Sequence, residues 1–284
     1  MNYEQFVSAM LAGIKEYATQ EECVEKQEII KNNGVVSVGI VIRTMGQKAA
    51  PLIYLEEYYQ KYRAGAPLET LVLHFLDRSR NAPAPPVWDY EKILDFEKIK
   101  SQIVYKLVNT KQNEQMLKKV PNLPILDFSI VFYLLISENE DGECSVLIRN
   151  EHMNLWKVPI SVLYQMAKKN TPKLCPYCIK SICECIQIPE EESAFQILTN
   201  EKGIHGATAI LYPNMPQKIR QLVESNYYLI PSSIHEFLIV PEIHGVQADS
   251  LCRILKEVNA TEIEPEEYLG DEIYYFDGDI ITKM

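Results

Sequence analysis

The sequence lacks long hydrophobic runs, an excess of basic residues and a glycine-rich phosphate loop. Its longest apolar run, residues 130–136, is far shorter than the roughly 20 residues that cross a bilayer, so we expect no membrane association. The 28 basic residues are outnumbered by 39 acidic ones, and the net charge is -11. A polyanion would meet net repulsion, which disfavours general nucleic-acid binding. Residues 203–206, Gly-Ile-His-Gly, do not have the spacing of a P-loop.

Export signals and a disulfide framework are also missing. The residues after Met1 are polar and acidic, with no basic stretch leading into an apolar one, so we expect no secretory signal. The seven cysteines are odd in number and partly clustered, which does not fit a set of disulfides. A cytoplasmic location is therefore expected. The hydrophobic fraction of 47% and the charged fraction of 24% are those of an ordinary globular protein.

Helical and strand patterns mix along the chain without a strict strand–helix alternation. Phe6, Met10 and Ile14 recur at helical spacing near the start. Two strand-like runs, residues 24–30 and 35–42, flank an Asn-Asn-Gly hairpin signal. We expect a helical stretch over residues 93–109 and a strand over residues 234–240. This mixture predicts an α+β fold, with mixed or antiparallel sheets and flanking helices.

A proline-rich segment separates two parts of the chain. Residues 83–86 contain three prolines in four positions, which neither a helix nor a central strand accommodates. We interpret the segment as a linker between an N-terminal α+β module, residues 1–82, and a larger C-terminal α+β domain, residues 91–284. The alternative is a surface loop within one domain.

Short segments spread over the chain form a recognisable ordered set. They are residues 2–6, 31–34, 53–55, 127–133, 198–200, 206–207 with 211–213, and 229–236. Together they resemble the bacterial family catalogued as domain of unknown function 5688, and the Pro-Ser-Ser-Ile-His-Glu segment is its most specific part. The resemblance implies membership over nearly the whole length. It implies no activity, because the family has none assigned.

A cysteine cluster that is not part of this resemblance is a candidate metal site. Cys175, Cys178, Cys183 and Cys185 fall within eleven residues. Four thiolates suit tetrahedral zinc, although the two pairs stand unusually close together for one ion. The alternative is a set of reduced thiols on a loop. The Cys-Pro-Tyr-Cys spacing also occurs in redox proteins, but there it begins a helix, whereas here it follows one.

A second candidate site lies in the family-specific segment. Ser233, His235 and Glu236, with His205 from a separate loop, supply the residue types of a hydrolytic site. In one continuous strand, however, Ser233 and His235 would share one face and Glu236 would point to the other. Adjacent positions could not then form a relay. The alternative is structural, with the Pro-Ser-Ser sequence making a turn and His235 bonded to its neighbours.

Two classes of function follow from these features. The first is a non-catalytic binding or regulatory protein whose partner is a protein or a small molecule; it rests on the lack of a convincing catalytic set. The second is a hydrolase that uses the segment from Ser232 to Glu236. A zinc-stabilised interaction module at the cysteines is compatible with either. The sequence predicts no particular oligomeric state.

The linker interpretation predicts a protease-sensitive site. Limited proteolysis is expected to cut first within residues 83–86 and to leave two resistant pieces, because few contacts should join the two parts. Mass spectrometry of the early fragments checks this. A first cut elsewhere, or complete degradation without resistant pieces, would contradict it.

Overall fold

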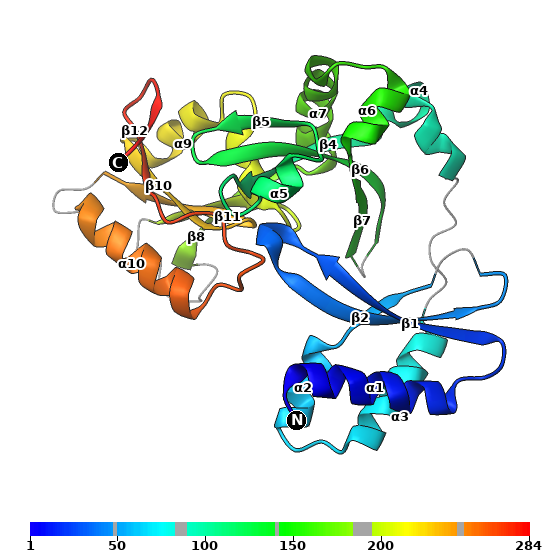
Figure 1. The fold of residues 1–284 in the computed structure, drawn as a ribbon. Helices are drawn as coiled ribbons and strands as arrows, with labels where there is room; N and C mark the ends of the chain where they lie inside the picture. The colour runs from blue at the N-terminus through cyan, green and yellow to red at the C-terminus, as the bar shows by residue number, and fades with distance from the viewer. Residues whose placement is uncertain (48–49, 83–89, 140–141, 184–194, 243–246) are drawn as a thin grey trace. The chain divides into compact units, whose positions relative to one another are not determined.

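The protein has an α+β fold, as predicted. The computed structural model describes residues 1–47, 50–82, 90–139, 142–183, 195–242 and 247–284 (Figure 1). The chain divides into two compact units, the first made of Met1–Lys31 and Val35–Trp88, and the second of Asn32–Gly34 and Asp89–Met284. The predicted linker, residues 83–86, lies outside the described residues, so its character stays a prediction.

The first unit packs helices on one antiparallel sheet. The sheet has the strand order β1-β2-β3, and β1 and β2 are the hairpin arms predicted around Asn-Asn-Gly. The elements are α1 (Tyr3–Tyr17), β1 (Glu22–Ile30), β2 (Val36–Thr44), β3 (Leu52–Tyr54), α2 (Glu56–Arg63) and α3 (Leu68–Arg80).

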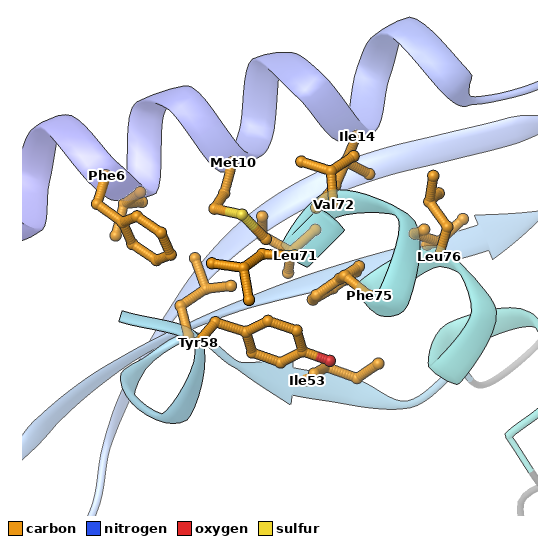
Figure 2. Packing of buried hydrophobic residues seen from close by; sticks show 13 residues of the cluster. Phe6, Met10, Ile14, Ile53, Tyr58, Leu71, Val72, Phe75 and Leu76 are labelled. Atoms are coloured by element: carbon orange, nitrogen blue, oxygen red, sulfur yellow. The ribbon is translucent and has the colours of Figure 1, made fainter. Parts of the chain in front are cut away.

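The core of the first unit follows from the apolar stripe of α1. Phe6, Met10 and Ile14 are fully buried and meet the buried side chains of α2, α3 and the sheet (Figure 2). A Cβ at Gly13 would lie 2.9 Å from Cγ2 of Val72, so glycine lets α1 and α3 approach closely. The apolar residues that recur at helical spacing in the sequence therefore form the buried face of α1.

The second unit holds two further antiparallel sheets. One has six strands in the order β13-β12-β10-β11-β9-β8; the other has the order β4-β6-β5, with β7 also paired to β6. The strands are β4 (Ile103–Asn109), β5 (Asn122–Ile125), β6 (Phe128–Asn139), β7 (Gly142–Leu147), β8 (Tyr177–Ser181), β9 (Gln196–Asn200), β10 (Tyr227–Ser233), β11 (Glu236–Pro241), β12 (Tyr274–Phe276) and β13 (Ile281–Lys283).

Helices of the second unit cover these sheets. In Figure 1, α10 lies beside β10, and its Leu255 packs in one cluster with Tyr228 and Ile230 of that strand. The helices are α4 (Phe96–Ile99), α5 (Glu114–Leu117), α6 (Asn150–Trp156), α7 (Ile160–Leu174), α9 (Met215–Val223) and α10 (Ala248–Thr261), and the 3-10 turns are η1 (Asn32–Gly34), η2 (Tyr90–Leu94), η3 (Lys100–Gln102) and η5 (Gly206–Leu211). None of the helices within the described ranges is long and apolar enough to cross a membrane.

The helix expected over residues 93–109 is wrong in its second half. Residues 103–109 form β4, and every one of its side chains is buried. The run is rich in β-branched and aromatic residues, which favours a strand covered on both faces. Its outer edge is also satisfied: the Tyr105 and Leu107 N–H groups donate to the hydroxyls of Thr171 in α7 (3.1 Å) and Thr208 in η5 (3.2 Å).

The two sheets of the second unit meet at an aromatic contact. Phe128, at the start of β6, lies 6.0 Å from the ring of Phe237 in β11 and 5.4 Å from that of Tyr274 in β12, measured between centroids. Rings at this separation attract each other beyond the area they bury. This contact joins the sheets and, as shown below, forms part of a pocket wall.

One ion pair of the first unit is expected to make stability depend on acid. Glu22 accepts hydrogen bonds from Arg80 Nε (3.0 Å) and Nη2 (2.8 Å), which lower the Glu22 pKa from 4.5 to about 2. A carboxyl with a lowered pKa stabilises the fold above its ordinary value, and that stabilisation is lost as the pH falls from about 4.5 towards 2. Arg80→Met should lower the free energy of unfolding at pH 7 by about 1 kcal/mol, since water screens the guanidinium, and should weaken this acid dependence.

Denaturant unfolding of wild type and Arg80→Met at pH 7 and pH 3 measures both effects. Lys26→Met is the control, because Lys26 and Glu28 form an exposed pair on β1 with side chains 43% and 57% exposed. Equal losses of unfolding free energy in the two variants would show that the Glu22–Arg80 pair contributes no more to stability than an exposed pair.

Candidate functional site

The segment from Ser232 to Glu236 contains a hairpin turn. Residues 234–235 connect β10 to β11, so the strand predicted over residues 234–240 is wrong at its start. The reason is local bonding that the residue types alone do not specify. Ser233 Oγ accepts the His235 N–H at 3.0 Å, and the Ile234 N–H donates to the Glu267 carbonyl at 2.8 Å. These bonds turn the chain where apolar alternation indicated a continuing strand.

His235 lies at this turn and faces a second histidine. Its Nδ1 accepts the His205 backbone N–H at 3.1 Å, and its Nε2 lies 3.4 Å from Glu267 Oε1. The two imidazole rings are 5.7 Å apart between centroids. Because Nδ1 accepts, the neutral ring carries its proton on Nε2, directed at the Glu267 carboxylate. The structure thus brings together two of the histidines that the sequence singled out.

The loop carrying His205 is held against the turn by a very close approach. A Cβ at Gly206 would lie 2.2 Å from Thr199 Oγ1 and 2.6 Å from the His235 carbonyl oxygen, so only glycine fits. Thr199 Oγ1 also donates to that carbonyl at 2.9 Å. Burial, with the positive charge of Lys106 and the neighbouring His235, holds the His205 pKa well below its ordinary value. His205 is therefore neutral at pH 7.

The serines and the glutamate of the segment do not complete a catalytic relay. Ser233 is buried, and its oxygen already accepts the His235 N–H. Ser232 Oγ lies 3.4 Å from Glu236 Oε1. Among the hydrogen bonds of the described residues, none joins a hydroxyl of this segment to an imidazole nitrogen. A general base within hydrogen-bond reach of a nucleophile is what such chemistry requires.

The cysteine cluster is described only in part. Cys175 follows the end of α7, Cys178 lies in β8 and Cys183 is buried after β8. Cys185 lies outside the described residues. Within the described ranges, no three His, Cys, Asp or Glu side chains gather as a metal site would require. The four-cysteine zinc site therefore stays a prediction.

An apolar pocket in the second unit was not predicted from the sequence. Its volume is about 300 Å³, and it lies where the two sheets meet. One or two residues from each of ten elements line it, namely β4, β5, β6, α7, η5, α9, β10, β11, β12 and β13. The aromatic members of its wall are Phe128, Tyr164, Tyr212, Phe237 and Tyr274.

The chain was compared with protein families, curated proteins and solved structures. The model of a family described as "Family of unknown function (DUF5688)" matches residues 3–278. The chain belongs to this family. The resemblance found in the sequence is thereby confirmed over nearly its full length. No curated protein and no solved structure matches the chain.

In this DUF5688 protein, a polar cavity adjoins the apolar pocket. Its volume is about 460 Å³, and Leu126 and Tyr274 line both spaces. The Tyr274 hydroxyl donates to Asp127 Oδ2 at 2.8 Å, and Lys283 Nζ lies 3.1 Å from Asp127 and 3.4 Å from Glu272. Burial and the bond to Asp127 raise the Tyr274 pKa, so the phenol stays a donor. We call this polar cavity the mouth.

Sequence patterns could not have revealed this pocket. The structure, however, shows an unusual backbone conformation at its mouth. Leu126 and Asp127 form the short connection between β5 and β6, and Leu126 has a φ of 53°. Leucine rarely adopts this left-handed conformation. A strained turn residue is a reason to examine its surroundings for function.

The bonding at the turn predicts a structural role for His235. His235→Ala is expected to lower the free energy of unfolding by about 1–3 kcal/mol, because it removes the acceptor of the His205 N–H. Ser232→Ala is the matched control from the same hairpin and should change stability by less than about 0.5 kcal/mol, since its single contact is long. Thermal and denaturant unfolding measure both. An unchanged melting temperature in His235→Ala would refute the structural assignment.

Proposed function

We propose that this chain is a non-catalytic binding protein that holds a small, largely apolar molecule in the pocket between the two sheets of its second unit. The observation that carries the proposal is the pocket itself. About 300 Å³ is the lower end of the range for small-molecule sites. A space lined by apolar and aromatic side chains, with polar groups confined to one end, is the usual form of such a site.

The bonding of the tyrosines supports an apolar occupant. The Tyr212 hydroxyl donates to the Cys175 carbonyl at 2.6 Å, and the Tyr274 hydroxyl to Asp127 at 2.8 Å. These two rings line the pocket while their hydroxyls are bonded elsewhere. Aliphatic neighbours such as Leu107, Leu229 and Ile281 complete the wall. Burying apolar surface there gains roughly 25 cal/mol per Å².

Binding without catalysis has better support than hydrolysis. The one serine buried beside the histidines is bonded to the backbone, and His205 and His235 hold the turn in place through Gly206. The pocket walls include none of Ser233, His235, Glu236 and His205. The hydrolase alternative would require these side chains to rearrange.

The setting we propose is the cytoplasm of a bacterium, with a small molecule as the partner. The seven cysteines suit a reducing compartment. The net charge of -11 argues against nucleic acid as the partner. A zinc-stabilised module at the cysteine cluster remains compatible with this proposal, because the pocket walls contain no cysteine.

A neutral apolar dye tests the proposed function. N-phenyl-1-naphthylamine should show a saturable rise in fluorescence with wild-type protein, because the pocket shields it from water. Ile281→Trp should remove the saturable signal by filling the pocket with an indole. Ile281 is only partly buried on the edge strand β13, so the fold should tolerate the change.

The neighbouring residue supplies the matched control. Ile280 is 55% exposed and is not part of the pocket wall. Ile280→Trp adds the same side chain at the adjacent position and should leave dye binding unchanged. Saturable binding of equal strength in both variants, with both folded by circular dichroism, would overturn the proposal.

A further inference from the structure

The mouth of the pocket is lined by more acidic than basic side chains. Its lining carries four carboxylates and two lysine ammonium groups, a net charge of two negatives at pH 7. Asp127 and Glu272 stand on either side of Lys283. The remaining charged groups of the lining are Lys111, Glu114 and Asp271.

The carboxylates of Asp127 and Glu272 are accessible to a ligand, and hydrogen bonds or ion pairs hold them in place. The side chains of Asp127 and Glu272 are 39% and 41% exposed. Asp127 accepts the Tyr274 hydroxyl, which fixes its carboxylate beside a ring that lines the apolar pocket. Asp271 accepts from Asn259 at 2.8 Å. A positive group at the mouth would therefore lie next to oriented negative charge, whereas a negative group would be repelled.

The pocket wall is rich in aromatic side chains. Five aromatic rings line it, and the faces of such rings attract cations. Tyr274 belongs to both spaces, so its ring adjoins the apolar body of a ligand and its hydroxyl adjoins the acidic end. The protein itself already places an ammonium at this point, that of Lys283, in contact with both carboxylates.

We propose that the ligand is an organic amine in its protonated form, with its apolar body in the pocket and its ammonium at Asp127 and Glu272. This inference rests on the proposed function and adds the chemical class of the ligand. The ligand ammonium would compete with Lys283 for the same carboxylates. Lys283 lies near the end of the edge strand β13 and is 44% exposed, so its side chain can move aside.

Three probes of equal length and different charge separate the possibilities. Calorimetry at pH 7 with n-octylamine, 1-octanol and octanoate compares a cation, a neutral molecule and an anion with the same chain. We expect octylamine to bind about tenfold more tightly than octanoate, with octanol in between. Tightest binding by octanoate would overturn the inference.

Two variants test the position of the charge. Lys283→Met should strengthen octylamine binding by removing its competitor, and should leave octanol unchanged. Glu272→Gln should weaken octylamine binding several-fold, whereas Glu257→Gln, an exposed carboxylate on α10 outside the mouth, should not. Weaker octylamine binding in Lys283→Met would contradict the competition. Both mouth variants change exposed side chains, so their folding should be intact and is checked by melting temperature.

The outcomes distinguish this inference from the function on which it rests. Equal binding of all three probes, or binding of the neutral dye alone, overturns the cation preference and leaves the pocket function standing. Failure of the dye and of all three probes overturns both. Blocking of octylamine by Ile281→Trp but not by Ile280→Trp places the supporting signal in the pocket.

Discussion

The second unit depends on one close approach, that of Gly206 to the backbone around it. With Thr199 Oγ1, the Asn200 nitrogen and the His235 carbonyl oxygen all within 2.6 Å of where a Cβ would stand, no other residue fits without moving a strand or the hairpin. The approach fixes the start of η5 against the β10–β11 turn. From there η5 places Thr208 on the edge of β4 and Ile210 and Leu211 in the pocket wall. The absence of a side chain at Gly206 thus allows the contact that positions the histidine pair, the edge of β4 and part of the pocket wall relative to one another.

This arrangement favours a structural interpretation of the segment from Ser232 to Glu236 over a catalytic one. Ser, Ser, His and Glu in succession suggest chemistry, yet the bonds of Ser233 and His235 are those of a turn and its anchor. An N–H shielded from water that lacks an acceptor destabilises a fold by roughly 1–3 kcal/mol. The imidazole of His235, which accepts the partly buried His205 N–H, therefore contributes to the fold directly. The lowered pKa of His205 keeps its imidazole neutral.

Local patterns predicted those parts of the fold that local forces decide. The stripe of Phe6, Met10 and Ile14 gave α1 its buried face, and Asn-Asn-Gly gave the first hairpin. Prediction failed where distant contacts decide. β4 was expected to be helical, and its edge is satisfied by Thr171 and Thr208, far along the chain. The β10–β11 turn depends on a carbonyl from residue 267. The pocket is lined by only one or two residues from each of ten elements, so no run of sequence encodes it.

At the turn that contains Leu126, the residue present is not one that the backbone conformation prefers. A connection between two strands that needs a positive φ is usually filled by Gly or Asn, and leucine in the left-handed region is less stable by about 1–2 kcal/mol. Packing in this structure offsets little of that, because Leu126 is 50% exposed. Its side chain nevertheless lines both the apolar pocket and the acidic mouth. Glycine or asparagine would relax the turn but would remove the apolar side chain that Leu126 contributes where the two spaces adjoin. If the pocket holds the apolar ligand proposed above, that ligand would cover part of Leu126, and the apolar surface buried there would offset part of the strain.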